Sequence, residues 1–178
     1  MKRLTLAIAG VLLALTALGS AHASATPAPA AAPLSGAGGA HGFDRFLRRY
    51  EAANTAFVNG DPRLWMAITA DEDPVSIFGG FGGLGDAGLA DVDTRYQLAA
   101  TAFLPSGANV DFTYLVKDVR GRLAYTVAIE RSNVVHAGHV APQPQVLPVT
   151  IIFRFDKGGW RIVHRHADTM VELQLATP

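Results

Sequence analysis

The chain has 178 residues, with 15 basic and 15 acidic side chains and no cysteine. This length allows one domain and leaves little room for a second. The balanced charge, without a basic stripe, gives a nucleic-acid partner no electrostatic support. The lack of cysteine excludes disulfides and thiolate nucleophiles. Hydrophobic residues make up 49 % and charged residues 17 %, a composition typical of a folded protein and not of a disordered one.

Residues 1–23 have the composition of a secretory signal peptide. Lys2 and Arg3 form a positive start, residues 4–18 are mostly apolar, and Ala21-His22-Ala23 fits the small-x-small cleavage pattern. The apolar stretch is shorter than the roughly 20 residues that span a bilayer. We therefore expect cleavage, export to a periplasm or the medium, and no stable membrane insertion of the mature protein.

The folded domain is expected over residues 42–174. The preceding residues 24–41 are mostly Ala, Pro, Gly, Ser and Thr, which is typical of a flexible linker. Apolar residues recur at helical spacing over 43–58, and a second helix is predicted from Asp61-Pro62 to about Ala70. A third helix is predicted over 91–103.

Most of the remaining sequence alternates as strands do. A short strand is predicted over 75–78, and long strands over 108–118, 123–131, 149–155 and 160–170. Residues 137–148 carry three prolines and are expected to form a loop or an irregular edge. The predicted fold class is α+β, with three N-terminal helices packed on a curved, mostly antiparallel sheet. A curved sheet that helices close on one side encloses a space, and the open end of that space is a ligand site by default.

Four segments, residues 46–62, 73–83, 123–131 and 159–168, together form a recognisable pattern. They resemble the SnoaL-like members of the nuclear transport factor 2-like superfamily, and the resemblance extends over about residues 43–172. It implies a cone-shaped, ketosteroid isomerase-like fold that often dimerises through its sheet. Members include isomerases, polyketide cyclases and dehydratases as well as binding domains without catalysis, so the resemblance leaves the activity open.

The last strand is the most informative for function. A period of two places Trp160, Ile162, His164, His166 and Asp168 on one face. With a turn at Lys157-Gly158, Phe155 opposes Trp160, Phe153 opposes Ile162 and Ile151 opposes His164. This face would form an apolar pocket wall with a polar end, although a slip of one residue would reverse it.

Three interpretations of the polar end stay open. His164 or His166 could act as a general base or acid oriented by Asp168, since histidine titrates near neutral pH. The His-x-His pair could hold a metal with Asp168, and with His136 or His139 nearby. Alternatively, the histidines are hydrogen-bonded wall residues. We predict His164 and Asp168 as candidate catalytic residues and expect no metal and no cofactor.

Further candidates for the pocket are Trp65, Tyr114, Tyr125 and Arg131, together with Ile162 and His166. Tyr114 could donate a hydrogen bond to a developing oxyanion, and it could equally be a core residue. Arg131 could bind an anion, pair with Asp168 or lie at an exposed strand end. Trp65 lines the pocket mouth or belongs to the core.

The sequence therefore predicts an exported, homodimeric domain that binds an unidentified small molecule in a hydrophobic pocket. The alternative is a cofactor-independent isomerase, cyclase or dehydratase in which a pocket His or Asp removes a proton beside a carbonyl. A third possibility is a structural module whose cavity is filled by side chains. Whether the chain is an enzyme stays open.

Overall fold

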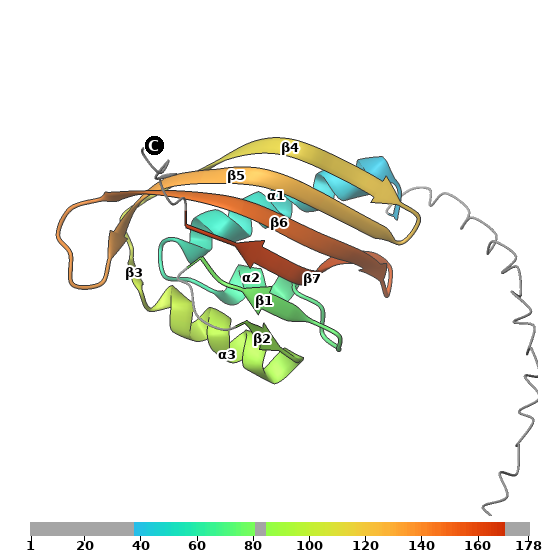
Figure 1. The fold of residues 1–178 in the computed structure, drawn as a ribbon, viewed down its shortest axis with the longest axis horizontal. Coiled ribbons are helices and arrows are strands. Elements are labelled where there is room, and N and C mark those ends of the chain that lie inside the picture. The colour runs from blue at the N-terminus through green and yellow to red at the C-terminus, as the bar shows by residue number, and fades with distance from the viewer. Residues whose placement is uncertain (1–37, 81–84, 170–178) are drawn as a thin grey trace, which may run out of the picture. The chain divides into compact units, whose positions relative to one another are not determined.

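The structure is a computed structural model that describes residues 38–80 and 85–169. The predicted signal peptide and nearly all of the predicted linker lie outside the described residues. The elements in chain order are α1 (Ala40–Phe57), α2 (Arg63–Ile68), β1 (Ser76–Phe78), β2 (Asp86–Ala87), α3 (Leu89–Ala100), β3 (Phe103–Leu104), β4 (Val110–Arg120), β5 (Leu123–His136), β6 (Gln143–Asp156) and β7 (Gly159–Ala167) (Figure 1).

The strands form one curved sheet with the order β2-β1-β7-β6-β5-β3. Strand β4 also pairs with β5, so β3 and β4 share one edge of β5. All of these pairings are antiparallel except that of β1 with β7. The predicted α+β class with a mostly antiparallel sheet is confirmed.

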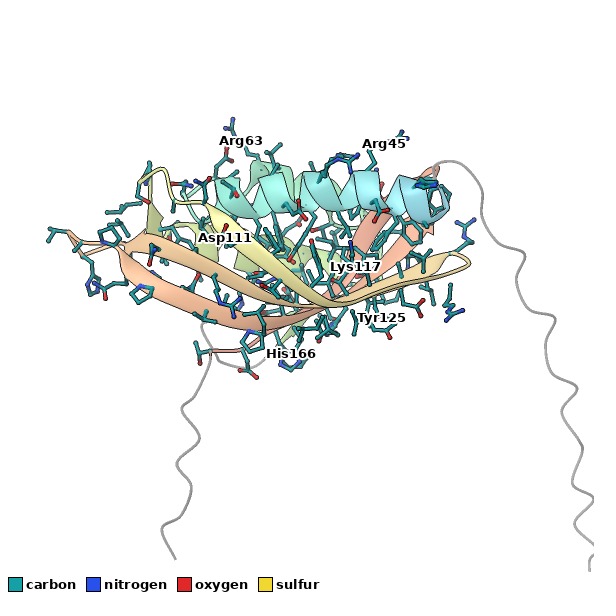
Figure 2. The ribbon with its side chains drawn as sticks, turned by 90° about the horizontal axis from the view of Figure 1, so that it is seen from above. Arg45, Arg63, Asp111, Lys117, Tyr125 and His166 are labelled. Carbon is teal, nitrogen blue, oxygen red and sulfur yellow. The ribbon has the colours of Figure 1, made fainter. Side chains whose placement is uncertain are left out.

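Helix α1 lies across the concave face of the sheet (Figure 2). Its buried side chains recur every three or four residues and include Phe43, Phe46, Leu47 and Tyr50, as expected for an amphipathic helix. The chain turns at Gly60, whose φ is +88°. A side chain there would also crowd the backbone oxygen of Phe103. Within the described ranges, no helix is long and apolar enough to cross a membrane.

Two predicted boundaries were wrong. The third helix ends at Ala100, and Phe103 begins a short strand that pairs with His136 of β5. The segment 137–148 is only partly loop, because β6 begins at Gln143. Prolines fit in the first part of β6, since that part extends beyond the end of β7 and pairs on one side only, with β5.

The register of the last hairpin agrees with the prediction only near the turn. Phe155 opposes Trp160 and Phe153 opposes Ile162, as predicted. His164, however, opposes Ile152, and Ile151 opposes Arg165. Val163 is the extra residue of a β-bulge between these pairs. The residues after it therefore change faces: Arg165 and Ala167 are buried, and His164 and His166 turn to the outer face.

A second bulge has the same effect in β4. Tyr114 opposes Ala128 and Val116 opposes Val127, so Leu115 is the extra residue. Unbroken alternation along β4 would place Val116 on the same face as Phe112 and Tyr114, and the bulge prevents this. Val116 lies on the outer face and is 37 % exposed.

Phe153 lies at the centre of the core. Its ring is edge-on to the rings of Phe43 and Phe46 on α1, and the distances between ring centroids are 5.1 and 5.6 Å. The centroid of the Tyr50 ring lies 6.2 Å from that of Phe153. Phe153 is fully buried. Since such aromatic pairs add to the free energy gained by burial, these contacts fix α1 on the sheet.

We predict that Phe153→Ala lowers the free energy of unfolding by about 3–5 kcal/mol, because it leaves a cavity between α1 and the sheet. Leu98→Ala, at a residue that is 65 % exposed on α3, should change it by less than about 0.5 kcal/mol. Urea unfolding of both variants measures the difference. An equal loss in the two variants would contradict this packing.

Candidate functional site

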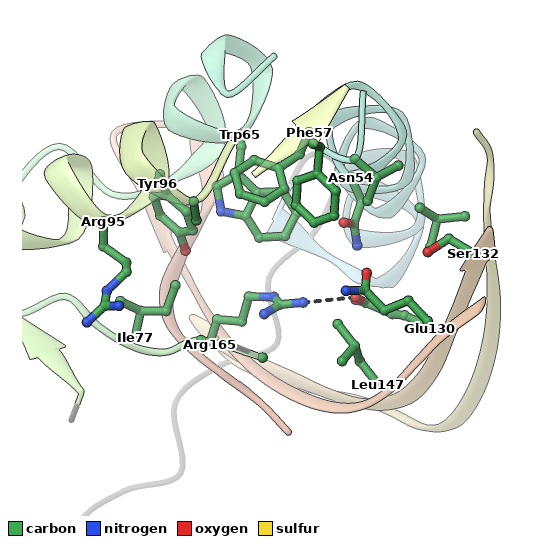
Figure 3. A pocket seen from close by; sticks show the side chains of 17 residues that line it. Asn54, Phe57, Trp65, Ile77, Arg95, Tyr96, Glu130, Ser132, Leu147 and Arg165 are labelled. Carbon is green, nitrogen blue, oxygen red and sulfur yellow. Dashed lines mark hydrogen bonds and ion pairs between the residues drawn. The ribbon is translucent and has the colours of Figure 1, made fainter. Parts of the chain in front are cut away.

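A pocket opens between the helices and the inner face of the sheet (Figure 3). The centres of water-sized spheres can occupy about 60 Å³ inside it, and the hollow continues into open solvent at its mouth. The described residues that line it come from all three helices and from six of the strands or the segments beside them: Asn54, Phe57, Val58, Trp65, Ile77, Gly79, Gly80, Arg95, Tyr96, Ala99, Phe103, Val110, Glu130, Ser132, Gln145, Leu147 and Arg165.

Aromatic rings from the three helices form one wall. The rings of Phe57 and Trp65 have centroids 5.8 Å apart, and those of Trp65 and Tyr96 are 5.6 Å apart. Trp65 and Tyr96 are buried. The rings of Phe57 and Tyr96 also contact each other, at 6.2 Å, so the three rings form one mainly apolar cluster.

An ion pair forms the floor of the pocket. Nη2 of Arg165 on β7 donates to Oε2 of Glu130 on β5 at 2.9 Å (Figure 3). Glu130 is 4 % exposed and Arg165 is 8 % exposed. The Tyr50 hydroxyl donates to Oε1 of Glu130, and Nδ2 of Asn54 donates to the Tyr50 oxygen at 3.4 Å. Both carboxylate oxygens therefore accept a hydrogen bond.

The guanidinium of Arg165 also lies against Trp65, with Cζ 5.5 Å from the ring centroid, a favourable cation–π contact. One N–H group here, Nε of Arg165, is buried and has no hydrogen-bond partner among the described residues. Buried donors of this kind are costly and require an explanation. The floor therefore offers donors in excess of acceptors.

The charges fix which groups act as donors. Burial and the neighbouring Glu130 raise the pKa of Tyr50 well above its usual value. Burial lowers the pKa of Arg165, but the charge and hydrogen bond of Glu130, together with Tyr50 and Tyr96, raise it overall. Burial raises the pKa of Tyr96 as well, and Trp65 partly offsets that rise. Tyr50 is therefore a neutral donor and Arg165 a permanent cation at neutral pH.

Of the residues predicted for the pocket, only Trp65 lines it. Ile162 is buried in the core. Tyr114 lies on the inner face, but its hydroxyl donates to Glu51 at 3.0 Å, which commits its proton. Tyr125 and Arg131 are exposed, because the face of β5 predicted to be internal is the outer one.

The histidines of β7 also lie outside the pocket. Nδ1 of His164 is 2.8 Å from Oγ of Ser76 on β1. Nε2 of His166 is 3.6 Å from Oδ2 of Asp168, and both of these side chains are more than half exposed. His166 is not among the residues that line the pocket, and catalysis by His164 and Asp168 stays a prediction. No three potential ligands among His, Asp and Glu converge within the described residues.

We predict that Arg165→Met lowers the free energy of unfolding by about 3–5 kcal/mol, because it leaves Glu130 buried without its partner. The double variant Glu130→Gln/Arg165→Met should lose less than the sum of its single variants. The control is Arg161→Met, on the same strand but partly exposed, for which we expect less than about 1 kcal/mol. Additive losses in chemical unfolding would contradict the pairing.

No protein-family model and no curated protein matches the sequence of this chain. Solved structures do match. A nuclear transport factor 2-like (NTF2-like) protein from Salmonella enterica serovar Typhimurium aligns with a TM-score of 0.62 at 16 % identity, over 78 % of this chain and 95 % of that one.

Two further matches carry more specific descriptions. An NTF2-like protein from Streptomyces avermitilis, provisionally assigned as a dehydratase, aligns with a TM-score of 0.55 at 21 % identity, over 72 % of this chain and 98 % of that one. A provisionally assigned calcium/calmodulin-dependent protein kinase II association domain from Thiobacillus denitrificans aligns with a TM-score of 0.56 at 19 % identity. The alignment covers 69 % of this chain and 93 % of that one. At these identities the likeness concerns the fold alone.

Proposed function

We propose that this chain, which has the NTF2-like fold, binds a small and largely apolar molecule in the pocket. The observation that carries the proposal is the open cavity itself, which has aromatic walls and a single buried ion pair at its floor. Mostly apolar pockets with a few convergent polar groups are the usual small-molecule sites. A structural module would fill this space with side chains.

The structure supports ligand binding in the pocket better than it supports catalysis by His164 and Asp168. A general base must reach the proton that it removes, and His164 and Asp168 lie on the face of the sheet opposite to the pocket. A substrate for them would have to bind on the outer face. Polar side chains that a pocket ligand can meet do line the cavity: Asn54, Arg95, Tyr96, Glu130, Ser132, Gln145 and Arg165.

The pocket can be tested by filling it. Ala99 on α3 lines the cavity, whereas Ala90 on the same helix is exposed. We expect Nile red, a neutral apolar dye, to gain fluorescence on the wild-type protein. Ala99→Trp should weaken the binding of the dye about tenfold or more, since the new side chain occupies its place, and Ala90→Trp should leave it unchanged. Equal dye binding in the three proteins would contradict binding in the pocket.

We further propose that the protein is an exported homodimer, joined through the outer face of the sheet. Tyr125 and Ile152 are paired neighbours on this face and are 40 and 38 % exposed. Leu123 and Val116 beside them are exposed too. Figure 2 shows Tyr125 and His166 on the side away from α1. An apolar patch of this kind is typical of an interface, and a two-fold axis would let the same patch cover itself.

Native mass spectrometry of the protein recovered after export tests both points. We expect a dimer whose subunits lack residues 1–23. Ile152→Lys should give a monomer, because it places a charge at the centre of the interface, while Leu64→Lys on exposed α2 should stay dimeric. A wild-type monomer would contradict the dimer, and a full-length subunit mass would contradict cleavage.

A further inference from the structure

We propose that the pocket ligand carries a neutral oxygen acceptor, such as a ketone or amide carbonyl, at the end that meets Arg165, and that the pocket selects against a carboxylate. This inference rests on the proposed function, since it names the class of molecule that the same pocket takes. The hydrogen bonds and charges of the pocket floor support the neutral acceptor, and the aromatic walls support an apolar body.

The hydrogen bonds show what the ligand must supply. Both oxygens of Glu130 already accept a hydrogen bond, one from Tyr50 and one from Arg165. The Tyr50 oxygen in turn accepts from Asn54. On the donor side, a guanidinium has five N–H bonds, of which a single one is committed to Glu130. A ligand that reaches the floor therefore meets unused N–H groups, and an oxygen acceptor complements them.

The charges decide between a neutral acceptor and an anion. Arg165 and Glu130 cancel each other, and both are buried. Arg95 also lines the pocket, but it forms an ion pair with Asp86. A carboxylate placed at the floor would lose its hydration and would lie beside the charge of Glu130, with no net positive charge to compensate. A carbonyl oxygen accepts the same hydrogen bonds without bringing a charge.

The walls define the rest of the molecule. Phe57, Trp65 and Tyr96 present ring faces and edges on one side, and Leu147 lies on the sheet side (Figure 3). A flat aromatic or alicyclic body would pack between them. The expected ligand is therefore a mainly apolar carbonyl compound of about the size of a fused two-ring system.

Three probes of similar shape separate the contributions of the hydrogen bond, the charge and the apolar body to binding. They are 2-acetonaphthone, with a carbonyl; 2-isopropenylnaphthalene, which has no acceptor; and 2-naphthoate, with a charge. We expect the ketone to bind about tenfold more tightly than each of the other two. The hydrocarbon lacks the hydrogen bond to the floor, and 2-naphthoate brings a charge that nothing there compensates. Competition with Nile red measures all three affinities on the wild-type protein.

Replacing Glu130 tests the charge argument directly. Glu130→Gln keeps the side-chain shape but leaves Arg165 as an uncompensated cation. The affinity for 2-naphthoate should then rise about tenfold, whereas that for the ketone should change less than about threefold. Glu51→Gln is the matched control, because Glu51 bonds Tyr114 and does not line the pocket. It should leave the order of the three affinities unchanged.

The outcomes distinguish the two proposals. Suppose that Ala99→Trp weakens dye binding, but 2-naphthoate or the hydrocarbon binds as tightly as the ketone. This result would overturn the proposed ligand class and leave the proposed binding in the pocket standing. A Glu130→Gln variant that folds without gaining affinity for naphthoate would also overturn the ligand class. If Glu130→Gln does not fold, the wild-type order of the three probes decides. Failure of the dye and of all three probes to bind would overturn the proposed function itself.

Discussion

The site depends on one extra residue in the last strand. Because side chains alternate along a strand, the bulge at Val163 exchanges the faces of all residues that follow it. Arg165 thereby enters the cavity, and a buried cation requires a partner. Glu130 supplies that partner from β5, and Tyr50 and Asn54 on α1 complete the network. A buried pair of this kind gives little net stability compared with an apolar pair, which is consistent with a role in binding.

Much of the fold could be predicted from the sequence, because the burial of one face imposes a period on each element. The apolar positions of α1 recur every three or four residues, and the last hairpin closes at Lys157-Gly158, where both φ angles are positive. The short pairings were not predictable. Strand β3 has two residues, and the first part of β6 contains prolines that are tolerated there only because β7 ends earlier.

The polar centre of the site could not be predicted, since two of its determinants have no simple sequence signal. A bulge leaves the composition unchanged, so simple alternation assigned His164 to the interior and left Arg165 outside. On β5 the buried face carries Thr126, Ala128 and Glu130, while apolar residues occupy the exposed one. Hydrophobicity alone therefore selects the wrong face. The sequence of the neighbouring β6 gave one warning, because apolar residues occur on both of its faces. In such a sheet, hydrophobicity does not identify the face that lines the cavity.

The most direct test of this account is a set of nuclear Overhauser contacts from the side chains of β7. We expect contacts between the Arg165 side chain and the indole ring of Trp65, and contacts between the ring of His164 and Ser76 on the outer face. Contacts from the His164 ring to Trp65 or Leu147, with an Arg165 side chain free in solvent, would contradict it.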